Sequence, residues 1–133
     1  MPQFREGDEL PPVVSPPIRR LEIAYMTVAM RDPNPVHLDD EVGRAAGLPS
    51  AIAHGTFPLA CLGNVITRHA GIAALQQLEV EILGPTFPGD RLECRGVVGD
   101  VESTAHNDVV TVDLTATNDS GALIARGRAR FSA

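Results

Sequence analysis

Asp32 and His37 are the two residues whose types and spacing most clearly favour chemistry. They lie five positions apart in the segment RDPNPVHLDD, residues 31–40, where Pro33 and Pro35 bracket Asn34. Proline fixes the backbone φ angle, so this loop is stiff enough to hold side chains in a working geometry. A carboxylate and an imidazole that converge on one water molecule can share the proton transfers needed to add that water to a double bond.

The same segment has a purely structural interpretation. The two prolines could form a rigid turn between helices, with His37 on the surface and Asp39 as the N-cap of a short helix. His37, Asp39 and Asp40 could also suggest a metal site. Nothing in the sequence indicates a third or fourth convergent ligand, so we predict no metal.

The segment IAHGT, residues 52–56, is the second candidate. It precedes an apolar stretch that reads as a helix, and the first N–H groups of a helix lack intrahelical partners. Gly55 would allow a substrate carbonyl to approach the backbone, so its N–H is a candidate oxyanion donor. For His54 we favour a structural role, because this task belongs to a backbone group.

Helical patterns that would position these segments lie in the first half of the chain. Residues 18–31 form one helix with Leu21, Ala24, Tyr25 and Val28 on one face, and Pro33 ends it. A short helix is expected at 39–46, closed by Gly47. A third helix should run from after Gly55 to about His69. It is apolar almost all round, which is typical of a buried helix.

The second half of the chain reads as antiparallel strands. Apolar and polar residues alternate, and turn signals such as Pro88-Gly89-Asp90 and Asn118-Asp119-Ser120-Gly121 separate the runs. The proline-rich opening segment is irregular or a short edge strand. The predicted strands are Gln77–Ile82, Arg91–Val98, Val109–Ala116 and Leu123–Phe131. This order predicts one α+β domain over residues 1–133, with an antiparallel sheet wrapped around a long central apolar helix.

Composition excludes several classes of function. The formal net charge is −6, which argues against nucleic acid or an anionic membrane as partner. Alternating arginines at 126–130 are most simply the solvent-facing side of the last strand. The two cysteines form no disulfide framework, and the sequence has neither a secretory signal nor a stretch that could span a bilayer. We therefore expect a cytoplasmic protein.

Together, these segments resemble the MaoC-like enoyl hydratases and dehydratases. The resemblance rests on the aspartate–Asn-Pro–histidine run, the acidic short helix after it, the Ile-x-His-Gly step into an apolar helix, and the Pro-Gly-Asp turn of FPGDRLECRGVV. That family has the hot-dog fold. It includes (R)-specific enoyl-CoA hydratases and (3R)-hydroxyacyl-ACP dehydratases.

The resemblance implies reversible hydration of a trans-2-enoyl thioester to a (3R)-hydroxyacyl thioester. Asp32 and His37 would be the catalytic pair, Asn34 would order the loop, and the Gly55 N–H would bind the thioester carbonyl. CoA or acyl carrier protein would be part of the substrate, with no further cofactor. The implied assembly is a homodimer, or a heterodimer as in some relatives, with the substrate between protomers.

The sequence departs from the family at residues that would order the site or bind substrate. Met30 and Arg31 replace a common small pair, and Thr56 stands where a methionine often follows His-Gly. Arg31 could narrow the pocket mouth or meet a phosphate of the carrier. Two alternatives remain open: a hot-dog acyl thioesterase, and a non-catalytic subunit of a heteromeric dehydratase.

Overall fold

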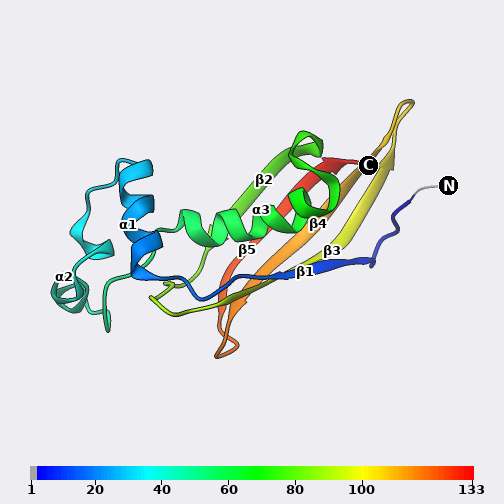
Figure 1. The fold of residues 1–133 in the computed structure, drawn as a ribbon. Helices are drawn as coiled ribbons and strands as arrows, with labels where there is room; N and C mark the ends of the chain where they lie inside the picture. Colours follow the sequence, from blue (N-terminus) through cyan, green and yellow to red (C-terminus); the bar gives the residue numbers. More distant parts are fainter. Residues whose placement is uncertain (1–2) are drawn as a thin grey trace.

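A single five-stranded antiparallel sheet packs against one long helix in the computed structural model, which describes residues 3–133. The strand order is β1-β3-β4-β5-β2. Figure 1 shows α3 lying along one face of the sheet, while α1 and α2 project beyond one end of it. In chain order the elements are β1 (Glu9–Val14), α1 (Arg20–Ala29), the 3-10 turn η1 (Pro35–His37), α2 (Asp40–Ala45), α3 (Thr56–Ala70), η2 (Ile72–Ala74), β2 (Leu75–Ile82), β3 (Leu92–Ser103), β4 (Asp108–Asn118) and β5 (Leu123–Ser132).

The core lies between α3 and the inner face of the sheet. Leu62, Val65 and Ile66 of α3 are at most 1% exposed and belong to the same apolar cluster as the inward residues of the strands. Gly96 permits this close approach, because a Cβ there would lie 3.1 Å from Val65 and 2.9 Å from Val112. Burying each such aliphatic side chain stabilises the fold by about 1.5–3 kcal/mol, so the α3 stripe is a major source of stability.

The predicted helix–sheet architecture is confirmed, with differences at its edges. The strands β3 and β4 run longer than predicted because they continue as a hairpin to Ser103 and Asp108. The opening segment does form an edge strand, β1, whose pairing with β3 shifts register between Leu10 and Val13, around two prolines that cannot donate to the ladder.

Two apolar helix faces are less buried than the sequence pattern predicts. The helix α3 is not buried all round, since one sheet covers only one side of it; Leu59 stays 39% exposed. On α1, Leu21, Tyr25 and Val28 are 52%, 66% and 77% exposed. That helix instead buries Ile23, which packs with Ile18 and Ala53. No helix within residues 3–133 is long and apolar enough to cross a membrane.

Candidate active site

Asp32 is positioned by the turn that ends α1. The backbone N–H groups of Arg31 and Asp32 donate to the carbonyls of Val28 and Thr27, at 3.1 and 3.0 Å. The backbone N–H of Asn34 then donates to Asp32 Oδ1 at 3.2 Å, which leaves Oδ2 free to face the site. The carboxylate is 39% exposed and thus lies at an opening of the molecule.

Arg31 makes this turn in a left-handed backbone conformation, with φ of 51°. Among the described residues it is the one non-glycine with positive φ. The conformation costs an L-residue with a Cβ roughly 1–2 kcal/mol. Strain of this kind next to a candidate catalytic carboxylate suggests a functional reason for the arginine.

His37 is held from the opposite side of the loop by η1. Asn34 caps this turn, because its Oδ1 accepts from the N–H of Val36 at 3.1 Å. The His37 ring Nδ1 lies 2.8 Å from the carbonyl oxygen of Ile52. A carbonyl only accepts, so Nδ1 carries the proton and Nε2 presents a lone pair. The His37 side chain is 10% exposed, so it is not the surface residue of the structural interpretation.

Asp32 Oδ2 and His37 Nε2 face each other across 3.4 Å. With the tautomer fixed by Ile52, both atoms are hydrogen-bond acceptors. They cannot bond to each other unless the imidazole is protonated. A water molecule can donate one hydrogen to each of them, which would leave its oxygen lone pairs directed away from both. The pair is therefore suited to binding and activating water.

His54 lies directly against this pair. Its ring stacks on that of His37, with 3.7 Å between centroids and 22° between planes, and the residue is 2% exposed. Its Nε2 is 3.9 Å from Asp32 Oδ2 and 3.4 Å from Thr27 Oγ1. Burial, and then the neighbouring His37, lower the pKa of His54, although Asp32 opposes this. The His54 ring is thus held neutral.

Asp32, His37 and His54 each place one potential ligand atom within 4.8 Å of the others. In stacked rings, however, the nitrogen lone pairs lie in two separate and nearly parallel planes, whereas a bound transition metal requires lone pairs that converge on one point. The arrangement fits proton transfer better than ion binding. The absence of a metal remains a prediction.

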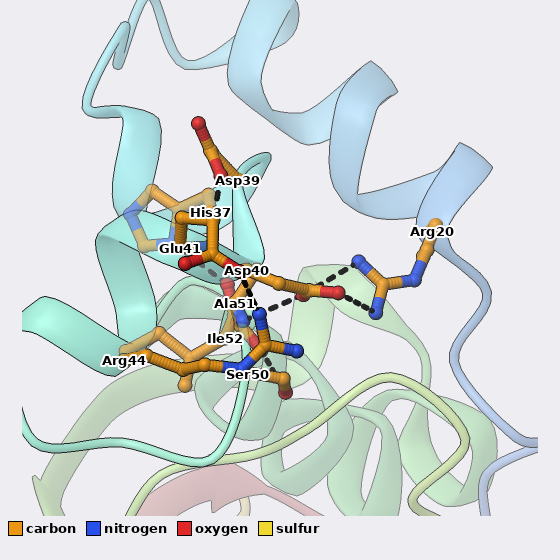
Figure 2. A network of polar contacts seen from close by, with 9 residues as sticks. All are labelled: Arg20, His37, Asp39, Asp40, Glu41, Arg44, Ser50, Ala51 and Ile52. Atoms are coloured by element: carbon orange, nitrogen blue, oxygen red, sulfur yellow. Dashed lines mark hydrogen bonds and ion pairs between the residues drawn. The ribbon is translucent and has the colours of Figure 1, made fainter.

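A polar network anchors the candidate loop to the rest of the molecule (Figure 2). The Asp40 carboxylate accepts from both terminal nitrogens of Arg20, each at 3.0 Å, and from the backbone N–H of Ala51 at 3.0 Å. The hydrogen bond from Ala51, followed by that from Arg20, lowers the pKa of Asp40. Asp39 caps α2 by accepting from the N–H of Glu41. The loop is therefore a capping structure as well as a candidate site.

Gly43 of α2 allows the segment that contacts His37 to pass closely. A Cβ at this position would lie 2.1 Å from the carbonyl oxygen of Ser50 and 2.9 Å from the N of Ala51.

We expect Gly43→Ala to lower the free energy of unfolding by about 2–4 kcal/mol, because the backbone must move to relieve the clash. Urea unfolding measures this. Gly47→Ala is a poor control because its φ is positive, so Ala45→Gly serves instead. An unchanged midpoint for Gly43→Ala would contradict the close packing.

Gly55 and Thr56 start α3 beside the histidine pair. Gly55 is exposed and its N–H has no hydrogen-bond acceptor among the described residues. The hydroxyl of Thr56 donates to Met30 Sδ at 2.9 Å and so joins the start of α3 to the end of α1. Gly55 therefore directly follows a residue whose ring stacks on that of His37.

The structure thus brings the two predicted segments together, 31–37 and 54–56. Sequence reasoning missed three groups on which the geometry depends: the Ile52 carbonyl, the Thr27 hydroxyl and the Asp40 carboxylate. Only Asp40 carried a signal, as a second acidic residue beside a helix cap. The backbone carbonyl could not be found from side-chain types.

Comparisons with known proteins agree with this fold. A model of the MaoC-like domain matches residues 6–120. A UPF0336 protein of Saccharopolyspora erythraea is 31% identical over 143 aligned residues, covering 92% of this chain and 90% of the relative. The (R)-hydratase from A. caviae involved in PHA biosynthesis superposes with a TM-score of 0.81 at 21% identity, with 96% of each chain covered. The HadBC (3R-hydroxyacyl-ACP dehydratase) complex from Mycobacterium tuberculosis superposes with a TM-score of 0.79 at 19% identity, with 100% of each chain covered.

One antiparallel sheet packed on a long helix, as in the hydratase and dehydratase structures that superpose on it, defines a hot-dog domain. The chain belongs to the MaoC-like domain family. The predicted α+β hot-dog architecture is confirmed.

Proposed function

We propose that this protein catalyses the reversible hydration of a trans-2-enoyl thioester to a (3R)-hydroxyacyl thioester. One observation carries the proposal: two acceptor atoms, Asp32 Oδ2 and His37 Nε2, are separated by 3.4 Å beside the start of α3. A water molecule beside this pair can lie within hydrogen-bond distance of both atoms and donate to each. Membership of a family of hydratases and dehydratases supports the same reaction class.

In the proposed hydration, His37 Nε2 takes a proton from the bound water while the water oxygen bonds to C3 of the substrate. Asp32 orients the water and stabilises the imidazolium that forms. Charge moves from the double bond to the thioester oxygen, which accepts a hydrogen bond from the Gly55 N–H. The imidazolium then gives its proton to C2. Dehydration follows the same steps in reverse, so one imidazole carries one proton in each direction.

Incubation with a trans-2-enoyl-CoA tests the proposal directly. Loss of the enoyl absorbance without release of free thiol supports a hydratase. Thiol release without hydration would instead support the alternative, an acyl thioesterase. No turnover on enoyl thioesters of any chain length, or on their 3-hydroxy counterparts, would favour a non-catalytic subunit. A chiral separation of the product checks the 3R configuration.

We also propose that Arg31 binds a phosphate of the substrate's carrier. Its side chain is exposed and forms no ion pair within the described residues, whereas Arg20, at the other end of α1, is paired with Asp40. An exposed guanidinium on the residue that precedes Asp32, held by a strained backbone, is suited to recognise the phosphate of CoA or phosphopantetheine. Asn34, His54 and Thr56 would order the site.

Arg31→Gly should separate the effect of backbone strain on stability from the effect of the guanidinium on substrate binding. We expect the free energy of unfolding to rise by about 1 kcal/mol, because glycine adopts positive φ without penalty. The KM for an enoyl-CoA should rise about threefold to tenfold, since one charge-assisted contact is lost. The KM for the phosphate-free N-acetylcysteamine thioester should stay unchanged. Arg95→Gln, on the face of the sheet that points away from α3, is the control. Equal KM changes for both substrates would contradict phosphate binding.

The working unit we propose is a homodimer, with a heterodimer as the alternative. Within residues 3–133 the edge strand β2 pairs only with β5, and Ile82 and Leu83 at its end are 43% and 42% exposed. A second copy would cover this edge and these apolar side chains. The structural neighbours include the ChsH1-ChsH2 complex from Mycobacterium tuberculosis. The thioester would lie between the two protomers.

A further inference from the structure

A cavity of about 350 Å³ lies next to His54. Its walls come from the segment around His54 and Gly55 and from the connection between β2 and β3, residues 82–86. The backbone N–H of Ala53 donates to the carbonyl of Thr86 at 2.8 Å and holds the two walls together. The proposed mechanism uses one residue of this lining, through the Gly55 N–H, and gives the rest of the cavity no role.

Two buried polar atoms on these walls have no hydrogen-bond partner: Nδ1 of His54 and Oγ1 of Thr86. They are the two such side-chain atoms within the described part of the chain, and their residues are 2% and 3% exposed. A buried polar atom without a partner is strongly unfavourable, and two of them beside one cavity are unusual. Each therefore needs a partner from within the cavity.

The hydrogen-bond roles of the two atoms are complementary. Thr27 Oγ1 donates its hydrogen to the carbonyl of Ile23 at 3.0 Å, so it can only accept from His54 Nε2. Asp32 Oδ2, on the other side of Nε2, is also an acceptor. These two acceptors favour the neutral tautomer in which His54 Nε2 carries the proton and Nδ1 presents a lone pair. Thr86 offers a hydroxyl donor that has no acceptor.

We propose that Thr86 is a positioning residue that acts on His54 Nδ1 through one water molecule bound in the cavity: the hydroxyl donates to the water, and the water donates to Nδ1. This water bridge holds His54 in the tautomer whose Nε2–H faces the Asp32 carboxylate. Together with the backbone hydrogen bond that fixes His37, it gives the stacked rings opposite tautomers: one presents a lone pair to the site and the other presents an N–H. The inference rests on the proposed hydration for its effect on turnover.

Loss of the Thr86 hydroxyl would release this constraint. The His54 ring could then move its proton to Nδ1 and turn a lone pair toward Asp32 and Thr27, where both neighbours are acceptors. The charge of Asp32 would lose a favourable donor. Asp32 and His37 are the titratable groups that act on His54.

The test compares Thr86→Val, which keeps the side-chain shape, with Thr86→Ser, which keeps the hydroxyl. Thr115→Val, at an exposed position of β4, is the matched control. Nitrogen NMR of the imidazole rings should show His54 as the Nε2–H tautomer in the natural protein and in Thr86→Ser, and as a mixture in Thr86→Val. Turnover of an enoyl thioester should fall about fivefold to tenfold in Thr86→Val with KM unchanged.

Three outcomes would overturn the inference: a His54 that is protonated on Nδ1 in the natural protein, a Thr86→Val variant with unaltered ring signals, or a turnover loss that Thr86→Ser does not restore. Because valine could weaken folding, the spectrum of the natural protein decides the tautomer on its own. A tautomer change without any hydratase activity would support the Thr86 contact while rejecting the proposed function.

Discussion

Asp32→Asn is expected to lower the turnover of a trans-2-enoyl thioester by about 10²- to 10⁴-fold. The amide keeps the shape of the carboxylate and can still accept from the N–H of Asn34 at the Oδ1 position. Its NH₂ group would then face His37 Nε2, which lies 3.4 Å from Oδ2. A donor at that place occupies the lone pair of the proposed base and displaces the water, so both functions of the pair are lost together.

Asp39→Asn is the matched control for this prediction. It removes the same charge from the same loop, and asparagine caps a helix about as well as aspartate. Asp39 is exposed and only accepts from the N–H of Glu41. We expect the control to retain turnover within about twofold and thermal unfolding of both variants to match the natural protein. Turnover of Asp32→Asn within threefold of the natural rate would remove Asp32 from the mechanism.

The sequence was sufficient for the architecture because its signals are local. Strict alternation in residues 77–82 predicts a strand with one solvent-facing side, which the structure shows as β2, and the apolar run after Gly55 predicts α3 almost to its ends. The candidate site could also be predicted from the sequence, since Asp32 and His37 lie in one short stretch. The second segment, 54–56, could be joined to it through the family resemblance.

The remaining features depend on contacts that no single segment encodes. The tautomer of His37 is fixed by the Ile52 carbonyl, fifteen residues away, and every residue type has such a carbonyl. The three-and-four spacing on α1 correctly predicts a helix, but the buried residue is Ile23. Periodicity identifies an apolar face, whereas the neighbouring elements decide which face is covered. This is also why Thr86 carried no signal in the sequence.

His37→Asn tests whether the imidazole acts through Nε2 rather than through its structural link to Ile52. The amide NH₂ of asparagine can occupy the place of Nδ1–H and keep the hydrogen bond to the Ile52 carbonyl, which measures 2.8 Å in the natural protein. Nothing then replaces Nε2. We expect near-normal stability and a loss of turnover of about 10²- to 10⁴-fold. His37→Ala should lose the same activity and about 1 kcal/mol of stability besides.

The Asp32→Asn/His37→Asn double variant shows whether the two groups share one step. If both act on a single water molecule, removing the second group costs little once the first is gone, because the water is already lost. The double variant should therefore turn over within about threefold of the slower single variant. Losses that multiply would mean that Asp32 and His37 act in separate steps. The close approach of Asp32 Oδ2 and His37 Nε2, at 3.4 Å, would then be a structural ion pair, and the two atoms would not share the attacking water.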